Sequence, residues 1–444
     1  MVRIIPYSAV KSTCKSFLGH VFDGKVSQIF KYAAEELLSA LIATDLPLIN
    51  NMAKSILSRQ GDYFSAMQLK NMQERISAWL ANYDFISMTR NFLWKNASKI
   101  LGDSVIAIDF SDISKEFGGN GMEGMARGYD GSRKTVAMGH DIVSVAIVAA
   151  KRAIPLAVEL IKGRKGKESK AKEIIKYITS LIHGIKPLFV FDRGFDSENF
   201  VNWILDESID AAIRIKELSR DVFGTKLDID KIMEREQNPT NTTLYSARRK
   251  VGATIKHKIG YWAKGGGKGN EQCLYRPVLI VSSFFNGSTI YLICTSQNDI
   301  TNMDSTSLSR MACKAAQAYF SRWDIEVFFQ DVKSMFGLEK ARVRTFKRLG
   351  NMVALSVLAY EYVRISLMES PESMRKFNKL FRDNFGTIID KFRPFVTTLR
   401  ELLKLDRARC ITGRPRKYTS SLWQYNANLF NWSSENVGCR ENPG

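Results

Sequence analysis

The stretch AYFSRWDIEVFFQDVK, residues 318–333, joins an almost wholly apolar helical pattern to one narrow polar stripe. Tyr319, Arg322, Glu326 and Lys333 recur through it at offsets of three, four and seven residues. At about 100° per residue, an α-helix places these four side chains within roughly 60° of one another. Burying charges costs several kcal/mol unless partners match them. The stripe therefore predicts a functional surface on a helix that is otherwise packed into a core.

Two interpretations of the stripe compete. Arg322 and Glu326 are spaced i, i+4 and can form an ordinary helical salt bridge, worth about 0.2–0.5 kcal/mol, although Glu before Arg is the better order. A DNA phosphate and a metal ion would match the whole stripe. In that interpretation Glu326 binds metal, while Tyr319, Arg322 and Lys333 hold phosphates by hydrogen bonds and charge.

The charge balance favours a polyanionic partner. The chain has 444 residues, with 65 Lys and Arg against 45 Asp and Glu, a formal charge of +20. Such an excess suits nucleic acid or an anionic membrane surface. The apolar segments are too short or too interrupted to span a membrane, and the first residues lack an export signal. The six cysteines form no C-x-x-C pair. We expect a cytoplasmic, multidomain protein that binds nucleic acid.

Two aspartates follow apolar runs that are typical of buried strands. Asp109 ends VIAID (105–109) and Asp192 ends LFVFD (188–192). Ligand sites of α/β sheets lie beyond strand ends, although an Asp there often only caps the following turn. Three carboxylates in a basic protein favour a metal site over the capping alternative. They predict a site for two Mg²⁺ ions, with Mn²⁺ as a substitute, because hard cations prefer carboxylate and phosphate oxygens.

The periodicity changes along the chain and predicts a mixed α/β fold. Three strands in hairpin order precede strands that alternate with helices, so a mixed sheet is expected. The predicted regions are a helical N-terminal DNA-binding region (1–98), the first part of a catalytic core (99–217), a β-rich insertion (218–300), the second part of the core with the Glu326 helix (301–370), and a helical and basic C-terminal region (371–444).

These motifs together resemble a known family. Y-x2-R-x3-E-x6-K, present as Tyr319, Arg322, Glu326 and Lys333, is the signature of bacterial cut-and-paste insertion-sequence transposases, the family numbered four within the DDE superfamily. The segments IEVFFQDVKSMFGLEKARVR (325–344), DRGF (192–195) and IDFSDISK (108–115) are also similar to that family. The resemblance covers roughly residues 100–365.

The resemblance implies an RNase H-like core interrupted by the insertion. It implies a catalytic triad of Asp109, Asp192 and Glu326 that binds two Mg²⁺ ions, nicks DNA at the element ends and joins the freed 3′-hydroxyl to target DNA. Tyr319, Arg322 and Lys333 would lie near the terminal 5′ phosphate. For the first acid, Asp112 is the alternative to Asp109, and we favour Asp109 because Asp112 is expected in the turn after the strand. The partners are terminal inverted repeats, target DNA and, by analogy, a second copy of the chain in a synaptic dimer.

A basic segment supplies further candidates. No acidic residue occurs between Gln237 and Asn270, where cations alternate with aromatic residues, a pattern suited to phosphate contact and base stacking. A solvated surface is the plainer alternative. The expected DNA contacts are Arg193, Arg248, Arg249 and Lys250, with Trp262 as a candidate to hold a flipped end base as in the family. Residues 162–172 and the GRPRK segment (413–417) are weaker candidates.

Two rival functions stay open at this point. The chain could be an RNase H-like nuclease that cuts without strand transfer, or a domesticated DNA-binding protein without activity. A binding protein has no need of three aligned carboxylates, so the triad argues against the last alternative.

Overall fold

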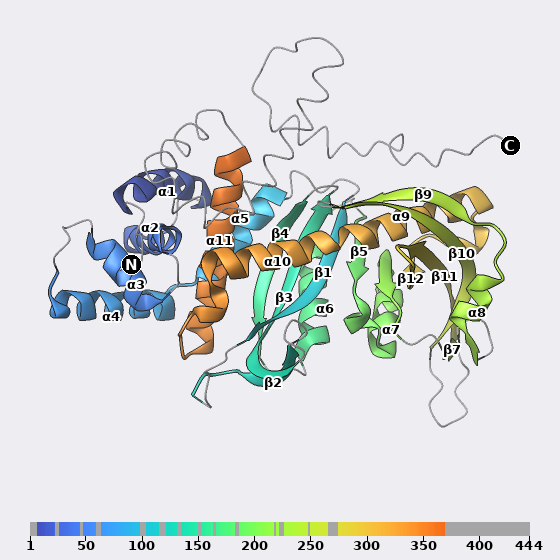
Figure 1. The fold of residues 1–444 in the computed structure, drawn as a ribbon, viewed down its shortest axis with the longest axis horizontal. Coiled ribbons are helices and arrows are strands. Elements are labelled where there is room, and N and C mark those ends of the chain that lie inside the picture. Colours follow the sequence, from blue (N-terminus) through green and yellow to red (C-terminus); the bar gives the residue numbers. More distant parts are fainter. Residues whose placement is uncertain are drawn as a thin grey trace, which may run out of the picture.

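A computed structural model describes residues 7–368 of the chain except 23–25, 45–47, 59–63, 98–103, 115–120, 131–134, 150–151, 163–165, 183–185, 217–218, 222–225, 247–248 and 265–273 (Figure 1). The predicted C-terminal region with its GRPRK segment lies outside the described residues, as does Arg248.

Most described strands belong to one mixed sheet of ten strands, in the order β2-β3-β1-β5-β6-β12-β11-β10-β9, with β4 paired to β3. The strands of its first half are β1 (Val105–Ser114), β2 (Ala126–Asp130), β3 (Thr135–Ala149), β4 (Arg152–Ile161), β5 (Leu188–Phe191) and β6 (Ala211–Arg214). β3 is antiparallel to β1 and β4, whereas β5 is parallel to β1 and β6. This order, β4-β3-β1-β5-β6, is that of an RNase H-like core, as predicted.

The predicted insertion extends this sheet. Its long strands are β9 (Thr240–Tyr245), β10 (Lys250–Lys264), β11 (Leu274–Phe285) and β12 (Ser288–Thr295), and β12 pairs antiparallel with β6. β7 (Ser219–Asp221) and β8 (Lys226–Asp228) form a separate two-stranded sheet, followed by the short helix α8 (Ile229–Glu234). The tight turn at Asn286-Gly287 has positive φ at both residues, which suits a two-residue hairpin turn. β9 is left at the edge of the large sheet.

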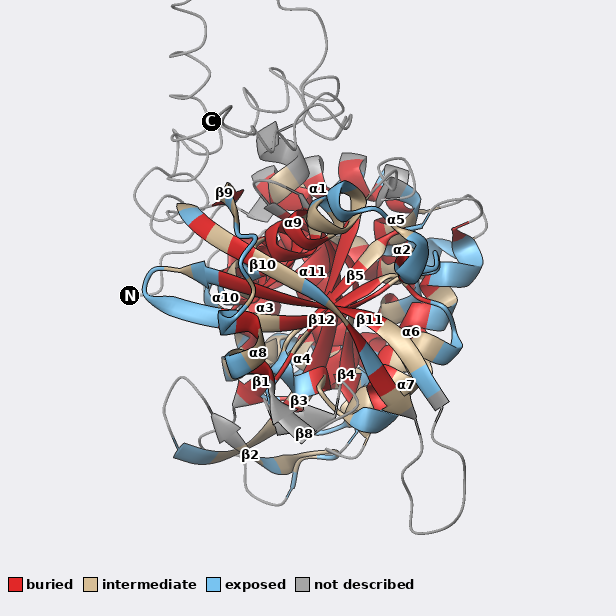
Figure 2. Cartoon of the chain, turned by 90° about the vertical axis from the view of Figure 1, so that its right-hand side faces the viewer, coloured by how far each residue is buried: buried red, intermediate tan, exposed pale blue. Residues whose placement is uncertain are grey.

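Helices cover both faces of the sheet. α6 (Lys167–Leu181) and α7 (Glu198–Asp206) pack on one face. α9 (Ser305–Ser321) and α10 (Trp323–Phe336) cross the other face end to end, α9 over β9 to β12 and α10 over β1, β3 and β4 (Figure 1). The strands between these layers are buried along most of their length (Figure 2). Among the described residues, no helix is long and apolar enough to cross a bilayer.

The strands are apolar on both faces, and alternate residues pack into different cores. Ala107 and Val190 belong to the cluster under α9 and α10, whereas Ile106, Ile108 and Phe191 belong to the cluster under α6 and α7. Successive side chains of a strand point to opposite faces. Within one strand, odd-numbered and even-numbered residues therefore meet different helices.

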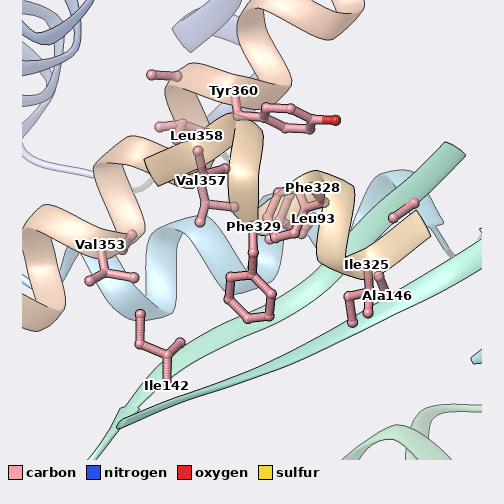
Figure 3. Packing of buried hydrophobic residues seen from close by; sticks show 14 of the residues in the cluster. Leu93, Ile142, Ala146, Ile325, Phe328, Phe329, Val353, Val357, Leu358 and Tyr360 are labelled. Carbon is pink, nitrogen blue, oxygen red and sulfur yellow. The ribbon is translucent and has the colours of Figure 1, made fainter. Parts of the chain in front are cut away.

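α10 is held by aromatic and aliphatic packing. Ile325, Phe328 and Phe329 lie against β3 and against α11 (Phe346–Met368) (Figure 3). Phe328 meets Tyr360 edge to face, with ring centroids 4.9 Å apart. Gly337 ends the helix with φ +56°, because glycine tolerates the left-handed conformation. α9 and α10 meet at Arg322.

The N-terminal helices pack into the same core as α10 and α11. They are α1 (Tyr7–Val21), α2 (Gln28–Ala43), α3 (Ile49–Leu57), α4 (Ala66–Asn82) and α5 (Phe85–Ala97). Buried Asn351 of α11 donates to the carbonyls of Leu80 and Tyr83, each at 2.8 Å, and accepts from the amide of Phe85 at 3.0 Å. One side chain therefore satisfies the ends of two helices that would otherwise carry unpaired backbone groups.

Candidate active site

Three neighbouring parallel strands deliver polar side chains to one place. The pairing of β1 with β5 ends at Ile108 opposite Phe191, so Asp109 and Asp192 follow at the same level. Both continue the face of Ala107 and Val190, which is covered by α9 and α10. On β6, Arg214 stands two residues after Ala212 and therefore points to this face as well. Strand parity thus explains why these three side chains meet.

The end of α9 and the start of α10 bring the opposing groups. Tyr319 lies in the last turn of α9, Arg322 forms the junction, and Glu326 lies in the first turn of α10. Arg322 is 5% exposed, although it carries a full charge. Its guanidinium donates 2.7 Å to Oδ2 of Asp109 and 2.6 Å to Oε1 of Glu326, and its Nη2 lies 4.0 Å from Oδ1 of Asp192. One cation therefore gathers the three predicted acids.

Tyr319 and Arg214 complete the arrangement on the Asp192 side. The Tyr319 hydroxyl donates to Oδ1 of Asp192 at 3.0 Å and accepts from Nη1 of Arg214 at 3.3 Å. Nη1 of Arg214 is also 3.7 Å from Asp192. The Arg322 guanidinium lies 5.4 Å from the centre of the Tyr319 ring. These contacts fix the orientation of Asp192 before any ligand binds.

Burial and mutual repulsion make the two aspartates different. Burial raises the pKa of Asp109 to about 7, with further upward contributions from Glu326 and Asp192 against the opposing charge of Arg322. Burial also acts to raise the pKa of Asp192, but Arg322, the Arg193 amide and Tyr319 outweigh it, so this pKa is lowered. Burial raises the pKa of Tyr319 to about 12, which keeps its hydroxyl a donor. Carboxylates with such divergent pKa values are typical of functional sites.

The chemistry of this donor set fits a hard divalent cation. Three carboxylates converge on a single positive charge, and carboxylate oxygens are the ligands that such ions prefer. In the described part of the chain, no three acidic, histidine or cysteine side chains are gathered closely enough to hold an ion as they stand. Arg322 lies between the acids, so its guanidinium has to move before Asp109, Asp192 and Glu326 can share a metal ion.

The other predicted DNA contacts lie at varying distances from this cluster. Lys333 is three turns further along α10 than Arg322 and pairs with Glu339 at 3.5 Å. Arg193 directly follows Asp192 and is exposed. Arg249 and Lys250 are exposed at the β9–β10 hairpin, where the Arg249 guanidinium lies 4.9 Å from the Trp323 ring centre. The structure therefore brings Arg249 beside the start of α10. Lys333 lies apart from Asp109, Asp192 and Glu326.

Two tryptophans differ from the sequence interpretation. Trp262, predicted to hold a flipped base, is 4% exposed within the core under α6 and α7, and its indole N–H donates to Asn202 at 2.9 Å. Its ring faces are packed against protein, so this structure does not support the prediction. Trp323, which belongs to the apolar pattern of 318–333 that was expected to pack into a core, is instead 43% exposed. The break at Arg322 and the cation above its ring explain why it faces outward.

The local setting of Asp109 also differs from the expectation. β1 continues to Ser114, so Asp109 does not end the strand, and Asp112 is a strand residue opposite Asp141 of β3 rather than part of a turn. Only the parallel pairing with β5 ends at Ile108. Asp112 has the parity of Ile108 and therefore points away from Arg322. Of the two alternatives, Asp109 is the one that lies with Asp192 and Glu326.

The fold and this acid cluster define a nucleic-acid-processing class of RNase H-like proteins. Comparison with protein families gives a match to the transposase DDE domain over residues 100–361, more than half of the 444-residue chain. The chain therefore belongs to the DDE transposase family. A comparison with curated individual proteins gave no match.

Sequence reasoning missed two residues of the site. Arg214 ends the apolar run AAIR in the same way that Asp192 ends LFVF, so a search for any polar residue after a buried strand could have found it. Gln317, which contacts the β9–β10 hairpin, carries no such signal, because an isolated glutamine in a helix is usually exposed.

Proposed function

We propose that this transposase carries out cut-and-paste transposition. It cleaves phosphodiester bonds at the ends of its element and joins the freed 3′-hydroxyl to target DNA, as a member of the insertion-sequence family numbered four. The observation that carries the proposal is the meeting of Asp109, Asp192 and Glu326 around the Arg322 guanidinium. Acids that come from two parallel strands and a helix have no structural need to converge.

Each acid has a distinct role in this proposal. Asp109, Asp192 and Glu326 hold two Mg²⁺ ions, for which Mn²⁺ can substitute. When bound, the ions activate the attacking water or 3′-hydroxyl and stabilise the leaving oxygen. Glu326 is the most exposed of the three side chains, at 38%, and therefore the one most able to reorient when the site fills. Asp192 stays oriented by Arg214 when Tyr319 turns its hydroxyl from this carboxylate to the DNA.

The cations of the site hold the DNA. Arg322 exchanges its carboxylate partners for a DNA phosphate, whose oxygens accept hydrogen bonds from both guanidinium Nη atoms. Tyr319 donates to the same phosphate group, and Lys333, Arg193, Arg249 and Lys250 contact the backbone on either side. The excess of 20 positive charges in the whole chain supports a duplex partner.

The assembly follows from the reaction. Two inverted-repeat ends are processed together, so the active form on DNA is a homodimer. Within each chain, the helical region 1–98 and the basic region 371–444 recognise DNA, the strands of 218–300 extend the DNA-binding surface, and residues 99–217 and 301–370 form the catalytic core.

Cleavage of the terminal repeats that flank the gene tests the proposal. In Mg²⁺, wild-type protein should release the element end, and Glu326→Gln should lower the rate by a factor of about 10²–10³, the usual cost of one lost electrostatic contact in a catalytic site. Asp112→Asn is the matched control, because it removes a carboxylate from the opposite face of β1. Equal cutting by wild type and Glu326→Gln contradicts the assignment.

Strand transfer separates a transposase from a nuclease. A pre-cleaved end with a free 3′-hydroxyl, incubated with a supercoiled plasmid, should become joined to it by wild-type protein. Cleavage without joining would identify the chain as an RNase H-like nuclease instead.

A further inference from the structure

The side chain of Gln317, on α9, hydrogen-bonds the backbone of the β9–β10 hairpin at Tyr245. Its side-chain oxygen accepts from the amide of Tyr245 at 2.9 Å, and its amide nitrogen donates to the Tyr245 carbonyl at 2.7 Å and to the Ser321 hydroxyl at 2.8 Å. The Ser321 hydroxyl donates to the same carbonyl at 3.2 Å. Gln317 is 9% exposed and thus sealed into the contact.

The contact replaces a missing strand. β9 is the edge of the large sheet, and an edge strand presents N–H and C=O groups without a neighbour. The Gln317 amide offers one acceptor and one donor to Tyr245, as the backbone of a further strand would. Water could satisfy an exposed edge equally well, so this pairing chiefly fixes where the end of β9 lies.

We call Tyr245, Ser246, Arg249 and Lys250 the hairpin tip, in which Ser246 is buried and the other three residues are exposed. The Ser246 amide donates to the Arg249 carbonyl at 2.9 Å, which closes the turn. Lys250 lies 5.6 Å from the Tyr245 ring centre and Arg249 lies 4.9 Å from that of Trp323. Trp323 follows Arg322 directly and precedes Glu326 by less than one turn. The contact of Gln317 with Tyr245 therefore holds Arg249 beside the start of α10, with Lys250 next to it in the chain.

We infer that Gln317 is a positioning residue, which holds the hairpin tip where Arg249 and Lys250 contact the same DNA that the acids cut. The inference rests on the proposed function. Gln317 itself touches no DNA. Its effect passes through the two cations, and so it disappears when they are absent.

A double-mutant cycle tests this dependence. Affinity for a fluorescein-labelled, blunt-ended linear duplex is measured without divalent metal over a range of salt concentrations. Arg249→Gln/Lys250→Gln should lower the slope of log K against log salt by about 1.8, at about 0.9 per lost phosphate contact. Gln317→Met, which keeps the length of the side chain, should weaken binding several-fold with a lower slope. Adding Gln317→Met to the double variant should change nothing further.

Ser309→Ala provides the matched control. Ser309 of α9 hydrogen-bonds Thr240 at the other end of β9, at 3.0 Å, so its loss removes a hairpin contact without freeing the tip. This variant should bind DNA as wild type does. Wild-type affinity and slope in Gln317→Met, an unchanged slope in Arg249→Gln/Lys250→Gln, or an undiminished Gln317→Met effect in the double variant would each overturn the inference.

Hydrogen exchange adds a measurement on the wild-type protein, which does not depend on whether a variant folds. In wild-type protein the Tyr245 amide should exchange slowly although it is on an edge strand, and it should exchange faster in Gln317→Met. Rapid exchange of the Tyr245 amide in wild-type protein would contradict its hydrogen bond to Gln317. If cleavage depends on Glu326 but Gln317→Met binds DNA as wild type does, only the positioning role of Gln317 is refuted. If no Glu326-dependent cleavage occurs, the proposed function is refuted.

Discussion

At the scale of single residues, Arg322 is the organising group of the site. It is buried among three carboxylates, so its own pKa is raised, chiefly by Asp109, even though burial acts to lower it. A guanidinium in this place neutralises acids that would otherwise repel one another. The same contacts also make it a competitor of any metal ion that the acids bind. Two predictions follow from this balance, one for Arg322 and one for Asp109.

Replacing Arg322 should strengthen metal binding by the DNA-free protein. An ion that displaces the guanidinium has to break charge-assisted hydrogen bonds worth about 1.5–3 kcal/mol each. Since about 1.4 kcal/mol is a factor of ten, Arg322→Gln should bind Mn²⁺ at least about tenfold more tightly than wild type. Isothermal titration calorimetry measures the difference.

The matched control for this titration is Arg310→Gln, which removes one positive charge from the exposed side of α9. It should leave Mn²⁺ affinity near that of wild type. Equal affinity of Arg322→Gln and wild type would show that Arg322 does not compete with the ion.

Asp109 should make the stability of the metal-free protein depend on pH. Its pKa is about 7 in the folded chain against an ordinary value of 3.8, so between these values the folded state holds a proton that the unfolded state has lost. Its contribution to the free energy of unfolding is therefore fully present below about pH 4 and decreases as pH rises towards 7. Urea unfolding of wild type and Asp109→Asn across this range isolates the contribution. A difference between the two proteins that does not vary with pH would contradict the prediction.

At the scale of elements, the position of α10 decides where Glu326 lies. Glu326 is linked to the other acids through Arg322, and the helix is anchored by the apolar side chains that meet β3 and α11 (Figure 3). The order of Arg before Glu, unfavourable for an isolated helix, is tolerated because Arg322 also bonds Asp109. The salt-bridge interpretation of the stripe is therefore confirmed for Arg322 and Glu326, and the metal and phosphate interpretation stays a prediction.

Truncating Phe328 should destabilise the protein strongly. Phe328 is almost fully buried against Tyr360, and removal of such a ring leaves a cavity, so Phe328→Ala should lower the free energy of unfolding by about 3–5 kcal/mol. Chemical denaturation measures this loss. Phe284→Ala, at a half-exposed phenylalanine of β11, should change stability by less than about 0.5 kcal/mol. Similar losses in both variants would contradict the packing role of Phe328.

At the scale of the whole molecule, the N-terminal helices and the catalytic core share one hydrophobic cluster. Asn351 links them, and a salt bridge between Arg90 of α5 and Glu159 of β4 adds to the same contact. Lys170 of α6 also pairs with Glu159, at 2.9 Å. The N-terminal region is thereby joined directly to α11 and β4.

Loss of the Asn351 amide should loosen this connection first. Asn351→Ala leaves three buried backbone groups without their partner, and we expect a loss of about 2–4 kcal/mol, since each such group costs about 1–3 kcal/mol before relaxation. Hydrogen exchange should show the earliest gain of exchange at the end of α4 and the start of α5. Asn91→Ala, at an exposed position of α5, is the control. Uniform exchange across the whole chain would contradict a local link.

The sequence by itself determined the mixed α/β class, most element positions and the candidate acids, with Asp112 left as the alternative to Asp109. Those predictions depend on local periodicity, on apolar runs that end in aspartate, and on the spacing of Tyr319, Arg322, Glu326 and Lys333. Only the tertiary structure decided which of these side chains meet. Strand parity separates Asp109 from Asp112, β12 joins the insertion to the core sheet, and Trp262 is buried whereas Trp323 is exposed. The physical reason is that contacts such as Arg322 with Asp109 and Gln317 with Tyr245 join residues far apart in the chain, and the register of strands and the packing of helices, rather than local spacing, bring them together.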